Sequence, residues 1–339
     1  MRTGRSGHAR VTRWTSRAAA VASVAVLSVL LVACGGSAAP VAATGGWSAP
    51  VHPEPVGQQA GYSSIYGVSC PTRSFCAAVD ESGDALLWNG SAWSAPSNVS
   101  PGGTLNSVSC TSSTFCVALS AQEAVTFDGS AWSAPVAVGP APSGPTGGQY
   151  EVSCVSPTFC ASVSTAGVVS LFDGTSWGHD AVVDDGTAQR PVQNISCATR
   201  TFCVVVSATG TIATFDGTTW THQPSPGQSL LHSASCPTPR FCMAVDLTGH
   251  ALLFDGSAWS VAPVMPDAGA LTFAVSCPEA GACKVARSDG SVTTWHTGTW
   301  TPSTPVLTDG TLATADISCA STAFCALVSS AGTAATFHG

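Results

Sequence analysis

Fourteen of the 15 cysteines in this chain of 339 residues fall into seven pairs, with five residues between the two thiols of each pair. The pairs are Cys70–Cys76, Cys110–Cys116, Cys154–Cys160, Cys197–Cys203, Cys236–Cys242, Cys277–Cys283 and Cys319–Cys325. Paired thiols form disulfides or bind metal ions. Metal sites usually have a shorter spacing or a recurrent histidine, and the histidines share no common place beside these pairs. Disulfides are typical of paired cysteines in exported proteins, so we expect seven of them and no bound metal.

A second group of candidates stands just before each cysteine pair, where residue type varies from copy to copy. Four residues before the first cysteine stand Tyr66, Asn106, Tyr150, Gln193, His232 and Phe273, and one residue later stand Glu151, Asn194 and Asp316. Repeated positions maintain a fold, so varying positions are free to specialise. Mixed aromatic, amide and carboxylate groups are typical of ligand pockets. We interpret these residues as the lining of a channel mouth, and a solvated funnel without a ligand is the alternative.

The elements that position both groups repeat along the chain. The first cysteines of successive pairs are 39–44 residues apart, and each copy contains four short runs with strand character. The first run ends at the first cysteine and the second begins beside the second cysteine. The third ends in Asn-Gly or Asp-Gly in five copies, which is a strong hairpin signal, and the fourth carries a tryptophan. Four strands in about 40 residues is the period of a β-propeller blade. The sequence therefore predicts an all-β, seven-bladed propeller.

The ends of the repeat array predict how the ring closes. We expect blades at approximately 62–96, 104–135, 147–180, 190–222, 230–262, 271–302 and 313–339, the last completed by 46–51. In the six complete copies an aromatic residue and the tryptophan are five positions apart, and the seventh aromatic, Phe337, has no tryptophan after it. Trp47 is the spare one. The segment around Trp47 should therefore form the outermost strand of the last blade, since an open ring would leave unpaired strand edges.

The first 34 residues have the pattern of an export signal. Five arginines precede an apolar run from Ala18 to Ala33, and the run ends in LVAC. LVAC resembles a lipobox, which implies that Cys34, the unpaired cysteine, becomes the lipid-bearing (palmitoylated) first residue of a lipoprotein. An ordinary signal peptide is the alternative. We expect a short tether at 35–45, a propeller at 46–339, and a location on the outer face of the cell membrane, held by the lipid alone.

Charge limits the function classes. All 19 acidic residues but only six of the 11 basic ones follow the leader, so the exported part carries 6 − 19 = −13 charges. This balance argues against nucleic acid, which needs clustered Lys and Arg. Glu151 and Asp316 come from the third and seventh copies, and we expect them to lie too far apart for a glycosidase pair, which needs about 5–9.5 Å. The sequence favours a monomeric, cofactor-free, non-catalytic module that binds a protein or a glycan. A glycan-active enzyme or a lectin is the alternative.

The repeat as a whole resembles known propellers. Phrases such as FDGTSW and FDGTTW are similar to the Asp-box of sialidase-type propellers, although here Asp and Gly are adjacent and the spacing is one residue short. The exported part of the chain resembles seven-bladed propellers of the sialidase- and WD40-like superfold, of the Cys-paired repeat kind found in secreted actinobacterial proteins. The resemblance implies a fold and a structural turn. It does not imply sialidase activity, because an arginine triad with a Tyr/Glu pair is not evident.

Overall fold

The structure is a computed structural model, and it describes residues 45–53, 63–139, 150–183, 192–227, 230–266, 269–307 and 315–339. All of these belong to one compact unit, 42–339. The expected signal at 1–34, with Cys34, and nearly all of the tether lie outside the described residues. Within the described ranges, no helix is long and apolar enough to cross a membrane.

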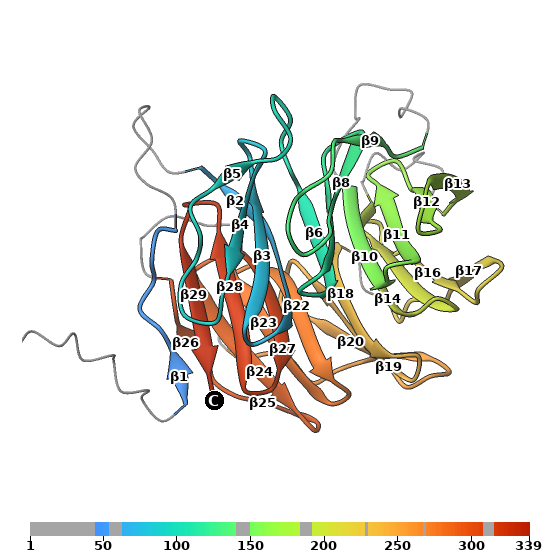
Figure 1. Ribbon diagram of the computed structural model, residues 1–339. Helices are drawn as coiled ribbons and strands as arrows, with labels where there is room; N and C mark the ends of the chain where they lie inside the picture. The colour runs from blue at the N-terminus through green and yellow to red at the C-terminus, as the bar shows by residue number, and fades with distance from the viewer. Residues whose placement is uncertain are drawn as a thin grey trace, which may run out of the picture. The chain divides into compact units, whose positions relative to one another are not determined.

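Short strands build the whole described structure (Figure 1). The innermost strands are β2 (Ile65–Thr72), β6 (Ser107–Ser112), β10 (Tyr150–Ser156), β14 (Val192–Thr199), β18 (Leu231–Thr238), β22 (Thr272–Glu279) and β27 (Ala315–Ser321). The second strands are β3 (Phe75–Asp80), β7 (Phe115–Leu119), β11 (Phe159–Ser164), β15 (Phe202–Ser207), β19 (Phe241–Asp246), β23 (Ala282–Arg287) and β28 (Phe324–Ser329). The third strands are β4 (Asp84–Trp88), β8 (Glu123–Phe127), β12 (Val168–Phe172), β16 (Ile212–Phe215), β20 (Ala251–Phe254), β24 (Ser291–His296) and β29 (Ala334–His338). The outer strands are β5 (Ser97–Asn98), β9 (Val136–Ala137), β13 (Trp177–Val182), β17 (Trp220–Gln223), β21 (Trp259–Val261), β25 (Thr299–Trp300), β26 (Thr304–Pro305) and β1 (Gly46–Trp47).

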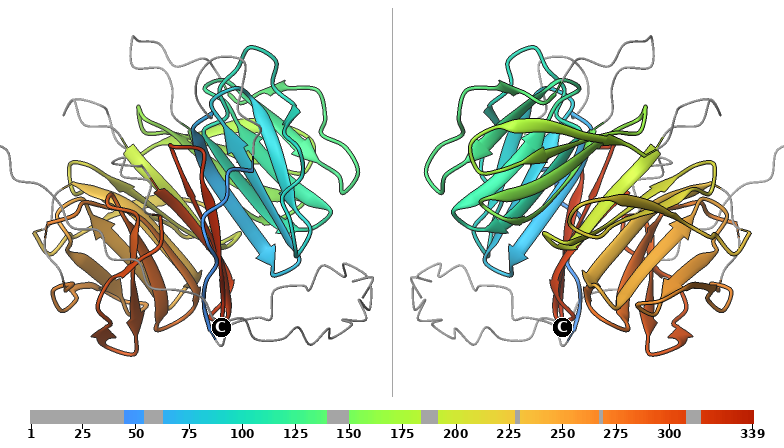
Figure 2. Two further views of the ribbon diagram at one scale, coloured as in Figure 1. Left: turned by 90° about the vertical axis from the view of Figure 1, so that its left-hand side faces the viewer. Right: turned by 90° about the vertical axis from the view of Figure 1, so that its right-hand side faces the viewer.

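These strands form seven antiparallel sheets, one for each predicted blade. The innermost strands contact one another in the order β2, β6, β10, β14, β18, β22, β27 and back to β2, so the blades form a closed ring. β1 pairs with β29, with Trp47 opposite Phe337, and the two rings lie 5.5 Å apart between centroids. Figures 1 and 2 show this N-terminal strand in blue beside the red C-terminal blade. The predicted fold class and its closure are confirmed.

Aromatic pairs hold the outer part of each blade. The third-strand aromatic and the tryptophan five positions later meet across the turn, with centroids 4.9–5.7 Å apart in the six complete copies. The turn Asp or Asn accepts hydrogen bonds from the two backbone N–H groups that follow the glycine, as Asp173 does from Thr175 and Ser176. Gly174 has φ +102°, a conformation that favours glycine. These contacts explain why the turn sequence repeats so closely.

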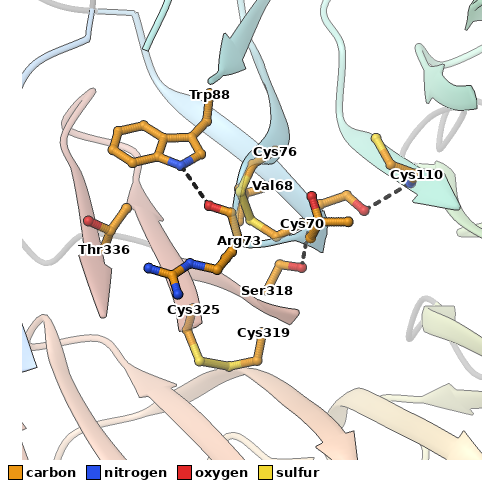
Figure 3. Close-up of a disulfide and its surroundings, with 12 residues drawn as sticks. Val68, Cys70, Arg73, Cys76, Trp88, Cys110, Ser318, Cys319, Cys325 and Thr336 are labelled. Carbon is orange, nitrogen blue, oxygen red and sulfur yellow. Dashed lines mark hydrogen bonds between the residues drawn. A yellow bond between two sulfur atoms is a disulfide. The ribbon is translucent and has the colours of Figure 1, made fainter. Parts of the chain in front are cut away.

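A ring of serine hydrogen bonds joins the innermost strands. The serine before the first cysteine of each blade accepts a bond of 2.9–3.0 Å from the backbone N–H of the first cysteine in the next blade. Figure 3 shows two of these bonds, beside the Cys70–Cys76 disulfide, with Ser318 accepting from Cys70. The seven donors and acceptors complete the circle. This serine is therefore repeated for its hydroxyl as well as for its small size.

Candidate functional site

The mouth residues, defined as those four and three positions before each first cysteine, lie at one end of the innermost strands. The serine bonds join the same two repeat positions at every blade boundary, so the innermost strands keep one register around the ring. Equivalent mouth residues therefore lie at about the same level. Four of the mouth residues stand where the register shifts, which marks a β-bulge, a feature that re-aims side chains. They are Tyr66, Gln193, His232 and Phe273.

Two of the mouth residues, Glu151 and Asp316, are carboxylates. The Glu151 carboxylate (β10) accepts a 2.9 Å hydrogen bond from the Ser107 hydroxyl of the preceding blade. Asp316 (β27) accepts backbone N–H bonds from Val68 of the first blade, at 2.8 Å, and from Ile317, at 2.9 Å. Both side chains keep partial exposure.

Protein surroundings disfavour the charged form of both groups. Burial raises the pKa of Glu151 to about 8, and the negative charge of Asp316 adds to this rise, against the hydrogen bond from Ser107. Burial also raises the pKa of Asp316, to about 6, against its two backbone hydrogen bonds. The two carboxylates, which come from blades three and seven, are thus within electrostatic reach of each other. No hydrogen bond between them is seen among the described residues.

Other mouth residues make contacts between blades. The Asn194 side-chain oxygen accepts from the Ala234 N–H at 3.0 Å. His232 Nδ1 donates to the Phe273 carbonyl at 2.7 Å, and the two rings meet edge to face with centroids 5.3 Å apart. Burial lowers the pKa of His232, so this histidine is neutral near pH 7 and supplies no cation to the carboxylates.

The remaining predicted residues lie at the same end of the innermost strands. Tyr66 is exposed, and its hydroxyl lies 3.4 Å from a Glu81 carboxylate oxygen. Asn106 and Gln193 are partly buried. Tyr150 begins β10 opposite Ser164, and the structure describes only its backbone.

The seven cysteine pairs form disulfides, as expected, with Cα atoms 3.9–4.1 Å apart. They lie at the opposite end of the innermost strands from the mouth residues. In Figure 3 the indole N–H of Trp88 donates to the carbonyl of Arg73 within such a disulfide loop, at 3.2 Å. In the part of the chain that the structure describes, no cluster of three or more His, Cys, Asp or Glu residues is arranged to hold a metal.

Sequence reasoning missed two features. The serine ring was visible as a repeated letter, but its bonding needs the spatial relation of neighbouring blades. The second feature lies between blades six and seven, where Ala282 replaces a phenylalanine found in the other six copies and Lys284 follows two residues later. Comparison of the seven copies could have revealed the second feature, because two residues of one strand differ from those in the other copies.

Seven sheets arranged in a closed ring define the chain as a seven-bladed β-propeller. No family model matches it, and no curated protein matches it in sequence. Solved structures share the fold. YCF48 from Cyanidioschyzon merolae has a TM-score of 0.61 at 13% identity, covering 81% of this chain and 95% of that one. A structure of YCF48 bound to D1 peptide has a TM-score of 0.64 at 15% identity, covering 86% and 97%. The WD40 propeller domain of Doa1 has a TM-score of 0.64 at 16% identity, covering 81% and 92%. At these identities the likeness shows the fold alone.

Proposed function

We propose that this protein is a membrane-anchored, extracytoplasmic binding module that holds a segment of a partner protein at its mouth residues. The observation that carries the proposal is the pair Glu151 and Asp316, two partly buried carboxylates that interact electrostatically. Among the described residues, no cationic side chain lies within ion-pair distance of either carboxylate. A Lys or Arg side chain of a ligand would favour the ionised form of both groups and pair with them.

Charge and the fold neighbours support a basic protein segment as the ligand. The chain carries 19 acidic and 11 basic residues, with five of the basic ones in the leader. Arg73, Arg200 and Arg240 belong to disulfide loops, far from the mouth along the innermost strands. A net negative charge steers cationic partners toward a protein. One neighbour in fold is YCF48 bound to D1 peptide. This supports a peptide as a ligand class for the architecture, although fold by itself does not determine function.

The leader supports the membrane location. Its arginines, apolar run and LVAC ending are the observations behind it, and lipid attachment at Cys34 would hold the propeller near the outer face of the membrane. The variant Cys34→Ser should incorporate no labelled palmitate and should be released from membranes. Retention of the variant in the membrane fraction would contradict lipid anchoring.

A glycan-active enzyme is the second candidate, because glycosidases also use two carboxylates with unlike pKa values as catalytic residues. The pKa values of about 8 for Glu151 and about 6 for Asp316 suit a general acid and a base. Turnover of chromogenic glycosides that is lost in both Glu151→Gln and Asp316→Asn would favour this candidate over binding alone.

The test is a parallel screen of the exported protein against a peptide library and a glycan array. We expect recovered peptides to be rich in Lys and Arg, and Glu151→Gln or Asp316→Asn to weaken their binding at least tenfold. Glu279→Gln, which removes an exposed carboxylate at the disulfide end, is the matched control and should bind like the parent protein. Glycan binding without peptide binding, or unchanged affinity in both mouth variants, would contradict the proposal.

A further inference from the structure

Strand β23 of blade six departs from the repeat at two positions. Phenylalanine precedes the second cysteine in the other six copies, and Ala282 takes its place in β23. The residue after the second cysteine is Ala, Val or Met in those copies, and here it is Lys284, the only lysine of the chain. In a repeat protein, two departures within one strand suggest that the junction with the next blade has a specialised task.

The missing phenyl ring leaves a hollow. Elsewhere this phenylalanine packs against the turn aromatic of the next blade, as Phe75 does on Phe127 with centroids 6.0 Å apart and Phe202 does on Phe254 at 5.8 Å. Ala282 cannot reach Phe337, the turn aromatic of blade seven. A cavity of about 130 Å³ lies there instead. Its lining includes Ala282, Lys284, Trp295, Ser321, Thr322 and Cys325.

Lys284 forms part of the wall of this hollow without a counter-ion. Its Nζ lies 4.0 Å from the centroid of the Phe337 ring and 3.3 Å from Thr294 Oγ1. The side chain is only 9% exposed, and it makes no ion pair with any carboxylate in the described ranges. Burial lowers the pKa of Lys284. Placing an ammonium group in apolar surroundings is costly unless an opposite charge accompanies it, so an anion bound here would offset that cost.

We propose that the hollow between blades six and seven binds a small organic carboxylate, with its anionic group at Lys284 Nζ and its short apolar part against Trp295 and the Cys319–Cys325 disulfide. Thr294, Ser321 and Thr322 line the same hollow, and their hydroxyl groups are of the kind that hydrogen-bonds carboxylate oxygens. Cavities of about 150 Å³ accept molecules as large as benzene, so a short-chain acid fits. This site is at the disulfide end of the blades and does not depend on the function proposed for the mouth residues.

The test uses the single lysine as its probe. Exported protein labelled with lysine that carries ¹³C at the ε-carbon alone gives one side-chain signal. The shift of this signal is followed as sodium butyrate is added at constant ionic strength. We expect a saturable shift with a dissociation constant in the millimolar range. Butyramide, a neutral molecule of the same shape, should give at least tenfold weaker binding. A linear response, equal to that of sodium chloride, would overturn the proposal.

Two variants supply the structural control, because each restores a residue that other blades already carry. Ala282→Phe fills the hollow, and Lys284→Met copies Met243 of blade five. Both should fold and both should lose butyrate binding at least tenfold, measured by calorimetry. The C-terminal carboxylate of a peptide is another source of the same anionic group. A tripeptide with a free carboxylate, compared with its amide, tests this source. Tighter binding of the tripeptide than of butyrate would identify the hollow as a site for peptide C-termini. Undiminished butyrate binding in both variants would overturn the site.

Discussion

At the residue scale, the carboxyl group of Glu151 keeps its proton to an unusually high pH. Asp316 accepts a hydrogen bond from the next blade, whereas Glu151 accepts one from the Ser107 hydroxyl of the preceding blade. Burial and the charge of Asp316 raise the pKa of Glu151 to about 8, against an ordinary value of 4.5. The folded protein therefore holds a proton that the unfolded chain releases near pH 4.5, and folding stability falls as the pH rises from there through 8.

Glu151→Gln should remove most of that decline. We expect the variant to be more stable than the parent at pH 9 by about 1–3 kcal/mol, a value reduced from the full linkage effect because the carboxylate keeps some contact with water. At pH 4 the two proteins should unfold alike. Denaturant unfolding from pH 4 to pH 9 measures the difference, with Glu279→Gln as the exposed control. Parallel stability profiles for parent and Glu151→Gln would contradict the raised pKa.

Each hydrogen bond of the serine ring should contribute to stability. Ser153→Ala should leave the Cys197 N–H without the 2.9 Å bond that joins blades three and four. Loss of one partner from such a bond costs about 1–3 kcal/mol. Ser97→Ala, in the exposed strand β5, should stay within about 0.5 kcal/mol of the parent. Thermal unfolding of both variants measures the contrast, and equal melting temperatures would argue that the ring bonds are replaceable.

At the element scale, the Trp-Ser phrase in three of the outer segments explains how a very short strand can complete a blade. Ser48 donates its backbone N–H to the Thr336 carbonyl at 2.7 Å, and its hydroxyl accepts the Thr336 N–H at 3.0 Å. A side chain thus replaces one backbone acceptor beside β29. Ser94 and Ser133 do the same in blades one and two, where the regular outer strands β5 and β9 begin only after the expected blade ends at 96 and 135.

Removal of residues 45–51 should therefore open the ring at blade seven. We expect the melting temperature to fall by several degrees, and amide exchange to rise first in β29, whose outer edge loses its partners. Trp177→Ala is the matched control, because it removes the same kind of cross-turn contact, at 5.2 Å, inside blade three and leaves the ring closed. Exchange in β29 that is no faster than in the control would contradict closure by the N-terminal strand.

At the scale of the whole molecule, the sequence predicted the features that repeat in every blade, but few of the contacts that are specific to particular blades. Seven cysteine pairs and the spare Trp47 were enough for the fold and its closure, because internal repetition reveals which positions are structural. The mouth residues were found as a varying set, yet the electrostatic contact between Glu151 and Asp316 depends on how two distant blades face one another. The hollow at Ala282 depends on packing between blades, which spacing along one chain does not reveal.

The two ends of the blades differ in chemistry. Disulfides and turn aromatics lie at one end, and the mouth residues place two acid groups without a described counter-ion at the other. We expect these acid groups to bind a cationic part of a partner. Because lysine keeps its charge up to about pH 10, the affinity for a lysine side chain should follow the ionisation of Glu151 and Asp316.

The most direct test is the pH dependence of the affinity for the peptide acetyl-Gly-Lys-Gly-amide, compared with its N-acetyl-lysine counterpart. We expect the exported protein to bind the lysine peptide at least tenfold more tightly at pH 9 than at pH 6. Glu151→Gln should lose most of that rise above pH 7, and the neutral peptide should show none. Affinity that is independent of pH, or equal for the two peptides, would contradict the assignment of the mouth residues as a cation-binding site.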